Sequence, residues 1–228
     1  MRELRIAGLD EAGRGCVIGP MAIAGVLVDE DGLARLVEIG VRDSKTLEPE
    51  ARERLAEQIK SIALAYRVVL VEPREIDRAV ATGGLNKLEA RVMASIIREL
   101  GPDVAYVDAS DVLEGRFALV ISSFLPPEHG VQVVAEHKAD AKYPVVSAAS
   151  ILAKVERDKA ISRLKAELGV DFGSGYPTDP RTIGFLRSWY EEHASFPPFV
   201  RRTWRTAREI ALELGARRLD EWGEQGGK

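Results

Sequence analysis

The order of the apolar runs along the chain constrains its fold more than any other feature. Five short apolar runs predict buried strands, at residues 4–10, 18–28, 65–72, 104–109 and 131–137. Amphipathic patterns predict helices, at residues 49–63, 85–100, 147–168, 181–193 and 203–219. Strands dominate the first part of the chain, the later strands alternate with helices, and only helices follow. This order predicts an α/β fold, in which helices flank a mixed five-stranded sheet and a helical appendage ends the chain.

Composition excludes several kinds of site. Cys16 is the only cysteine among 228 residues, so the chain forms no intrachain disulfide and no zinc site with several cysteine ligands. The N-terminal apolar stretch is too short for a signal peptide, and no window approaches the roughly 20 apolar residues that span a bilayer. We therefore expect a soluble, cytoplasmic protein.

Acidic residues follow three of the predicted strands. Asp10 and Glu11 end the first strand, Asp108 ends the fourth, and Asp140 lies just past the fifth. An isolated pair such as Asp10–Glu11 more often starts a turn, but neighbouring strands would bring Asp10 and Asp108 to one edge of the sheet. Like charges that close are unfavourable unless cations neutralise them. Oxygen ligands without sulfur or nitrogen select Mg²⁺ or Mn²⁺, the ions of phosphate chemistry.

A glycine-rich turn directly follows the first acids, as Gly13–Arg14–Gly15. Glycines alone are weak evidence, because many turns use their positive φ angles. Beside a metal site they are stronger evidence for substrate binding, since a small residue lets the backbone approach a sugar and Arg14 supplies charge for a phosphate.

Taken together, these motifs resemble the type 2 ribonuclease H family, ribonuclease HII. The matching segments occur in the family's order: DEAGRG at 10–15, DSK at 43–45, YVD at 106–108, the block 138–154 and GSGYP at 173–177. The resemblance extends from residue 4 to about residue 210, and the segment 199–207 is closest to archaeal and eukaryotic members. Overall the pattern is closest to archaeal members. Cys16 stands where many archaeal members carry proline, although others carry cysteine there.

The resemblance implies a ribonuclease H-like sheet with strand order 3-2-1-4-5. It implies a catalytic domain at residues 1–170 and a helical substrate-binding segment at residues 171–228. Four acids would hold two divalent cations, Mg²⁺ or Mn²⁺: Asp10, Glu11, Asp108 and Asp140. The implied activity is endonucleolytic hydrolysis of RNA in RNA/DNA hybrids, and cleavage 5′ of single ribonucleotides in duplex DNA, leaving 3′-OH and 5′-phosphate ends.

The resemblance also implies seven substrate contacts. Gly13, Arg14 and Gly15 would contact a ribose 2′-OH and the adjacent phosphate, and Tyr176 would bind the same hydroxyl and stack on the next sugar. The remaining contacts would be to phosphates, by Lys45 and Thr206 on the DNA strand and by Lys138 at the cut strand.

A basic run, Arg201, Arg202, Arg205 and Arg208, stands out in a chain of net charge −4. It predicts either a solvated helix face or a local phosphate-binding surface. Trp189, Trp204 and Trp222 are expected to be packing residues. We expect a monomer with RNA/DNA hybrid and ribonucleotide-containing DNA as partners; the sequence shows no convincing sliding-clamp motif, so that contact stays open.

Two other functions remain alternatives. A ribonuclease H-like DNA nuclease is disfavoured by Gly13–Arg14–Gly15 and Tyr176, because DNA has no 2′-OH to recognise. A non-catalytic nucleic-acid-binding subunit is disfavoured because all four acids are present.

Overall fold

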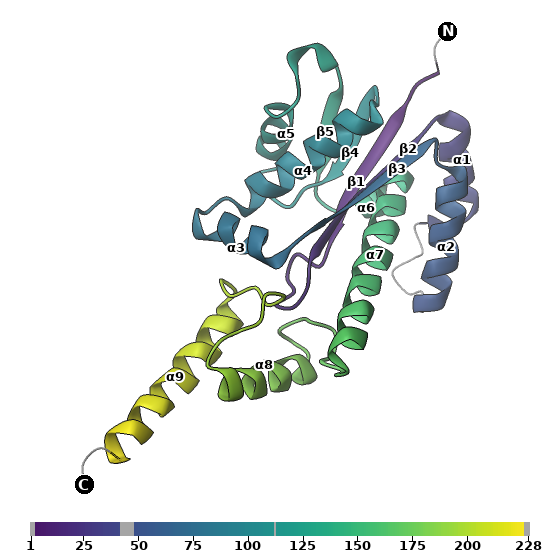
Figure 1. The fold of residues 1–228 in the computed structure, drawn as a ribbon. Helices are drawn as coiled ribbons and strands as arrows, with labels where there is room; N and C mark the ends of the chain where they lie inside the picture. Colours follow the sequence, from purple (N-terminus) through teal and green to yellow (C-terminus); the bar gives the residue numbers. More distant parts are fainter. Residues whose placement is uncertain (1–2, 42–47, 112, 226–228) are drawn as a thin grey trace. The chain divides into compact units, whose positions relative to one another are not determined.

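The computed structural model describes residues 3–41, 48–111 and 113–225, and within residues 217–225 only the backbone (Figure 1). The chain divides into two compact units. The first comprises residues 1–14, 21–71 and 84–158, and the second comprises residues 15–20, 72–83 and 159–228. The sequence analysis instead predicts two domains that meet at a single boundary, at residue 170, and this boundary stays a prediction. In the described part of the chain no helix is long and apolar enough to cross a membrane.

The first unit contains a five-stranded mixed sheet, as predicted. Its strands are β1 (Ile6–Ala12), β2 (Met21–Val28), β3 (Ala65–Val71), β4 (Val104–Asp108) and β5 (Gln132–Glu136). They lie in the order β3-β2-β1-β4-β5, which confirms the order that the resemblance implied. β2 is antiparallel to both β1 and β3, whereas β4 is parallel to both β1 and β5.

Helices cover both faces of this sheet (Figure 1). On one face lie α1 (Glu30–Glu38), α2 (Pro49–Ile62) and the first part of α7 (Pro144–Leu168). On the other lies α4 (Leu85–Leu100), next to α5 (Glu114–Ser122). Two glycines allow this close packing. A Cβ on Gly8 of β1 would lie 2.3 Å from the Val145 backbone of α7, and one on Gly25 of β2 would lie 2.4 Å from Ile96 of α4.

The second unit is helical and has its own apolar core. It contains α3 (Pro73–Ala81), the end of α7, α8 (Pro180–His193) and α9 (Arg205–Gln225). Buried side chains from α7, α8, α9, residues 15–20 and the connecting loops form the core, among them Ile18, Ile161, Phe172, Leu186 and Ile210. The segment 15–20 therefore packs as part of this unit, although it continues the chain from β1.

Short helices are the main elements that the sequence pattern did not predict. α1, α3 and α5 have nine residues each, so they span too few turns to show a helical period. The one-turn helix α6 (Ala139–Lys142) and the 3₁₀ turn η2 (Pro127–His129) are shorter still. α7 starts at Pro144, three residues before the predicted start, because proline is well suited to the first turn of a helix.

Candidate active site

The strand register brings two of the predicted acids together, Asp10 and Asp108. β1 and β4 are parallel neighbours that pair Leu9 with Val107, so Asp10 and Asp108 follow side by side. Asp10 and Glu11 lie inside β1 and not beyond its end, because β1 stays paired with β2 as far as Ala12.

Asp10 is almost completely buried, with 4% of its surface exposed. The pKa of Asp10 rises from 3.8 to about 7, mainly because of burial and in part because of the negative charge of Asp108. A hydrogen bond with Ser150 and the charge of Lys154, both on α7, oppose this rise. The carboxyl group is thus held where ionisation is unfavourable without a positive partner.

Glu11 is in the same electrostatic situation. Burial raises its pKa well above the usual value, and so do the charges of Asp10, Glu89 and Asp108, in that order. Its Oε2 atom is buried and has no hydrogen-bond partner. A buried carboxylate oxygen without a donor is rare, and it fits a site that can hold a cation.

A tight turn after β5 fixes Asp108 and positions Asp140, the fourth predicted acid. Lys138 adopts a left-handed backbone conformation, with φ of 56°, which is uncommon for a residue with a Cβ atom. The next residue, Ala139, donates its backbone N–H to Asp108 Oδ1 at 2.7 Å. Asp140 follows in the first turn of α6 and is partly exposed. The turn therefore fixes Asp108 through the N–H of Ala139, and Asp140 is the next residue in the chain.

The donor chemistry of these acids fits a hard divalent cation. Asp10, Glu11 and Asp108 interact electrostatically, and every ligand atom that they offer is oxygen. Within residues 3–41, 48–111 and 113–225, however, no group of three or more histidine, cysteine, aspartate or glutamate side chains is arranged as a preformed metal centre. The structure thus brings three acids into one electrostatic cluster without arranging all four as ligands.

Arg14 is anchored by residues that the sequence did not single out. Its Nε donates to Glu89 Oε1 and its Nη2 to Asn86 Oδ1, both at 2.7 Å. The Glu89 side chain is fully buried and also accepts a 2.6 Å hydrogen bond from Ser110 Oγ. A charge-assisted pair of this kind fixes the side chain of Arg14 in one geometry. Gly13 before it has φ of 80°, a conformation that favours glycine.

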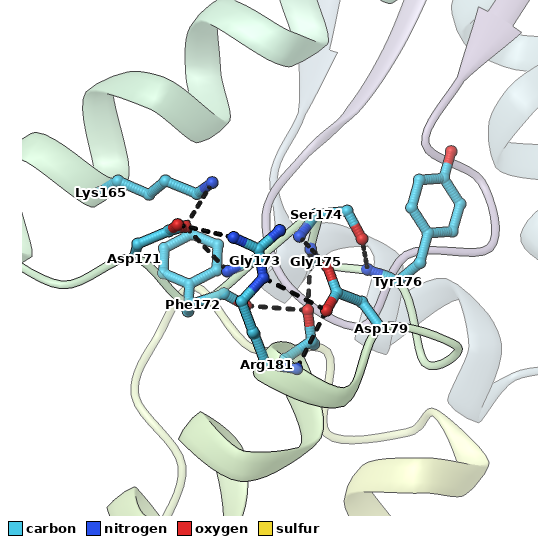
Figure 2. A network of polar contacts seen from close by, with 10 residues as sticks. Lys165, Asp171, Phe172, Gly173, Ser174, Gly175, Tyr176, Asp179 and Arg181 are labelled. Carbon is cyan, nitrogen blue, oxygen red and sulfur yellow. Dashed lines mark hydrogen bonds and ion pairs between the residues drawn. The ribbon is translucent and has the colours of Figure 1, made fainter.

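In the second unit, a polar network holds the loop that carries Tyr176 (Figure 2). Asp171 accepts from Lys165, Gly173 N and Arg181 at 2.7, 3.0 and 2.8 Å. The Tyr176 side chain points away from this network and is 37% exposed. The loop is therefore fixed by its polar residues while the tyrosine ring is presented to solvent.

The basic run near the C-terminus is only partly a surface feature. Arg201 is completely buried, so its inclusion in a phosphate-binding surface was wrong. Inside the unit its Nε donates to the carbonyl of Gly19 at 3.0 Å. Arg205, by contrast, is highly exposed and pairs with Glu209 one turn along α9, and Thr206 lies in the first turn of that helix. A helix N-terminus with an exposed arginine suits a phosphate.

Lys45, the other predicted phosphate ligand, lies outside the described residues together with Asp43 and Ser44. The roles of all the predicted site residues stay predictions.

Glu89, Ser150 and Lys154 are the residues that the sequence analysis left without a role. The sequence contains an indication of the role of Glu89. Its spacing from Met93, Ile96 and Leu100 places it on the apolar face of the helix, and an acid on that face needs a buried partner. Ser150 and Lys154 are four residues apart, so they lie on one face of α7.

Solved structures share this fold closely. Ribonuclease H2 from Pyrococcus horikoshii OT3 superposes with a TM-score of 0.86 at 48% identity, covering 92% of this chain and 99% of that one. Ribonuclease HII from Archaeoglobus fulgidus, solved in complex with PCNA, has a TM-score of 0.81 at 46% identity, covering 89% and 96%. Together with the acids on β1 and β4, the fold defines a ribonuclease H-like hydrolase.

Sequence comparison specifies the family. The ribonuclease HII family model matches residues 7–207. Ribonuclease HII from Pyrococcus furiosus is 50% identical over 217 residues, covering 94% of this chain and 95% of the relative. The chain therefore belongs to the ribonuclease HII family, and it is a hydrolase with ribonuclease H activity on RNA paired with DNA. The archaeal relatives confirm the predicted resemblance.

Proposed function

We propose that the enzyme hydrolyses the RNA strand of RNA/DNA hybrids and also cuts 5′ of single ribonucleotides in duplex DNA, leaving 3′-OH and 5′-phosphate ends. The observation that carries this proposal is the cluster of mutually repelling acids around the buried Asp10, near the carboxyl ends of β1 and β4. Such a cluster is favourable only with cations, and cations at carboxylates serve phosphoryl chemistry.

Asp10, Glu11, Asp108 and Asp140 would hold two divalent cations, Mg²⁺ or Mn²⁺. A pair of such cations, when bound, supplies Lewis-acid activation of water and of the scissile phosphate. The chain's own residues would position the carboxylates and stabilise their ionised forms. Ser150 orients the Asp10 carboxylate through its hydrogen bond, and Lys154 stabilises the ionised form. The Ala139 N–H keeps Asp108 in its rotamer.

Sugar recognition is proposed for Gly13, Arg14, Gly15 and Tyr176. The 2′-OH is the group that distinguishes RNA from DNA, and backbone groups of small residues can approach it closely. Lys138 is exposed and two residues from Asp140, which suits contact with the cut strand, and Thr206 and Lys45 are proposed for the DNA strand.

A sliding clamp is proposed as a protein partner. The support is the Archaeoglobus relative, which was solved in complex with PCNA. We further propose that the enzyme acts on its nucleic acid substrates as a monomer.

The decisive test is cleavage of a DNA duplex that contains one ribonucleotide, beside the same duplex made only of DNA. We expect one cut, 5′ of the ribonucleotide, that disappears after exhaustive chelation and returns with Mg²⁺ or Mn²⁺. Cleavage of the all-DNA duplex would favour a DNA nuclease instead. Binding without any cleavage in either metal would favour a non-catalytic subunit.

Tyr176 gives a second test, because its ring and its hydroxyl make separate contributions. Tyr176→Phe is expected to keep the stacking on the following deoxyribose and lose one hydrogen bond, a loss of about 2- to 13-fold in rate. Tyr176→Ala should lose both interactions and most cleavage at a single ribonucleotide. The measurement is kcat/KM on that substrate, with thermal unfolding as the control. Wild-type activity in a stable Tyr176→Ala variant would make the tyrosine structural.

A further inference from the structure

Three segments of the second unit meet around Gly15 and Tyr176: residues 15–20, 173–182 and 199–204. The backbone N–H groups of Val17 and Ile18 both donate to the carbonyl of Gly175, at 2.9 and 3.2 Å. A Cβ placed on Gly15 would lie 3.9 Å from Cε1 of Tyr176, which is van der Waals contact. The Gly15 backbone and the tyrosine ring are therefore direct neighbours.

Trp204 fixes the Gly15 side of this arrangement. Its indole Nε1 donates to the carbonyl of Gly15 at 3.3 Å. The Arg201 guanidinium lies 4.9 Å from the centre of the indole ring, and Arg201 is itself held by Gly19, as described above. A buried cation that stacks on the ring restricts the indole to one orientation, so its N–H is directed at Gly15.

Asp179 fixes the Tyr176 side. Its Oδ2 accepts from the backbone N–H of Ser174 at 2.7 Å, and its Oδ1 accepts from the backbone N–H of Arg181 at 2.9 Å, at the start of α8 (Figure 2). The loop passes so close that a Cβ on Gly173 would lie 2.4 Å from Asp179 Oδ2. One carboxylate thus closes the loop onto the helix and sets the conformation of the residues next to Tyr176.

We propose that Trp204 and Asp179 are positioning residues for sugar recognition, acting through Gly15 and Tyr176. The inference rests on the proposed function of those two residues. Both contacts are to backbone atoms whose placement determines where the Gly15 backbone and the tyrosine ring lie. A recognition site works best when its groups are held before the substrate arrives, and small displacements reduce the rate strongly.

The test compares Trp204→Phe with Trp189→Phe, which removes an indole from the same unit where it stacks on His193. The readout is the ratio of kcat/KM on single-ribonucleotide DNA to kcat/KM on an RNA/DNA hybrid with a long RNA tract. A following ribose crowds the tyrosine ring, so only the first substrate depends fully on Tyr176. This ratio is independent of the fraction of active enzyme. Trp204→Phe should lower it by about 2- to 10-fold, as expected for one hydrogen bond, while Trp189→Phe leaves it unchanged.

Asp179→Asn is the second variant, since it keeps the size of the side chain and weakens the two backbone contacts. It should lower the same ratio. In a Tyr176→Ala background, neither Trp204→Phe nor Asp179→Asn should lower the ratio further. Asp179 acts on the ratio through Tyr176, and Trp204 acts on it through the Gly15 backbone that borders the tyrosine ring, so both effects need that ring. The inference is overturned if Trp204→Phe leaves the ratio at its wild-type value or lowers it equally in both backgrounds. A wild-type ratio in Tyr176→Ala alone would instead contradict the proposed role of Tyr176.

Discussion

Asp108→Asn is expected to reduce kcat by about 1,000-fold or more while the protein stays folded, a loss of about 4 kcal/mol of transition-state stabilisation. Asp108 lies beside Asp10 in the register of two parallel strands and contributes to the electrostatic cluster around Glu11. The amide removes one negative charge and keeps the shape. Its oxygen can still accept the N–H of Ala139, so the turn after β5 should survive. The measurement is single-turnover cleavage of a hybrid in millimolar Mg²⁺, with circular dichroism to check the fold.

Glu136→Gln is the matched control for this variant. Glu136 pairs with Asp108 across β4 and β5, so it occupies the corresponding position one strand further along the sheet. Its carboxylate is satisfied by Lys142 and Tyr143, and no catalytic role is proposed for it. We expect Glu136→Gln to cleave at close to the wild-type rate. If Asp108→Asn did the same, Asp108 would not be a metal ligand.

The sheet and the placement of its acids were predictable because both depend on short-range patterns. Short apolar runs mark buried strands, and an acid directly after such a run is expected at or near the end of a strand. The five strands in the structure follow those runs, and the parallel register then brings Asp10 and Asp108 together. Only the exact bounds moved, as in β1, which continues through Glu11 to Ala12.

Contacts between distant parts of the chain were not predictable in the same way. Arg201 has the sequence context of a surface arginine. It is nevertheless buried, and it donates a hydrogen bond to Gly19, which is 182 residues away in the chain. Arg14 and Glu89 are 75 residues apart, and neither pattern alone indicates the pair. A charged side chain is unfavourable to bury unless a partner is close to it, and the tertiary fold determines which partner is close.

The buried acids also make a prediction about stability. A carboxyl group whose pKa is raised by folding destabilises the protein wherever the unfolded chain would be ionised. For Asp10 the pKa rises from 3.8 to about 7, which corresponds to at most about 4 kcal/mol at high pH. Part of that cost is shared with the neighbouring acids. The active site is therefore expected to reduce the free energy of unfolding of the metal-free enzyme.

Asp10→Asn should accordingly raise the free energy of unfolding in a chelator, by about 1–3 kcal/mol at pH 8. Asn is neutral at every pH and can still accept the hydrogen bond from Ser150. In the wild type, Asp10 is protonated in both the folded and the unfolded state below pH 3.8, so its burial costs no ionisation energy there; the destabilisation grows as the pH rises from 3.8 to about 7. The gain from Asp10→Asn should therefore be near zero at pH 4, grow between pH 4 and 7, and level off above that. Urea unfolding across this range measures it.

Asp111→Asn is the control with the opposite sign. Asp111 is also buried, but hydrogen bonds from Arg116 lower its pKa to about 2, so its charge stabilises the fold. Removal of this charge should destabilise the protein at pH 8, and that effect should diminish as the pH falls from 4 towards 2.

Adding Mg²⁺ should stabilise the wild type more than Asp10→Asn, because a cation bound to the folded state favours the ionised carboxylate. If Asp10→Asn were destabilising at pH 8 in chelator, the buried acids would be satisfied by contacts within the protein, and the case for cations at this site would fail.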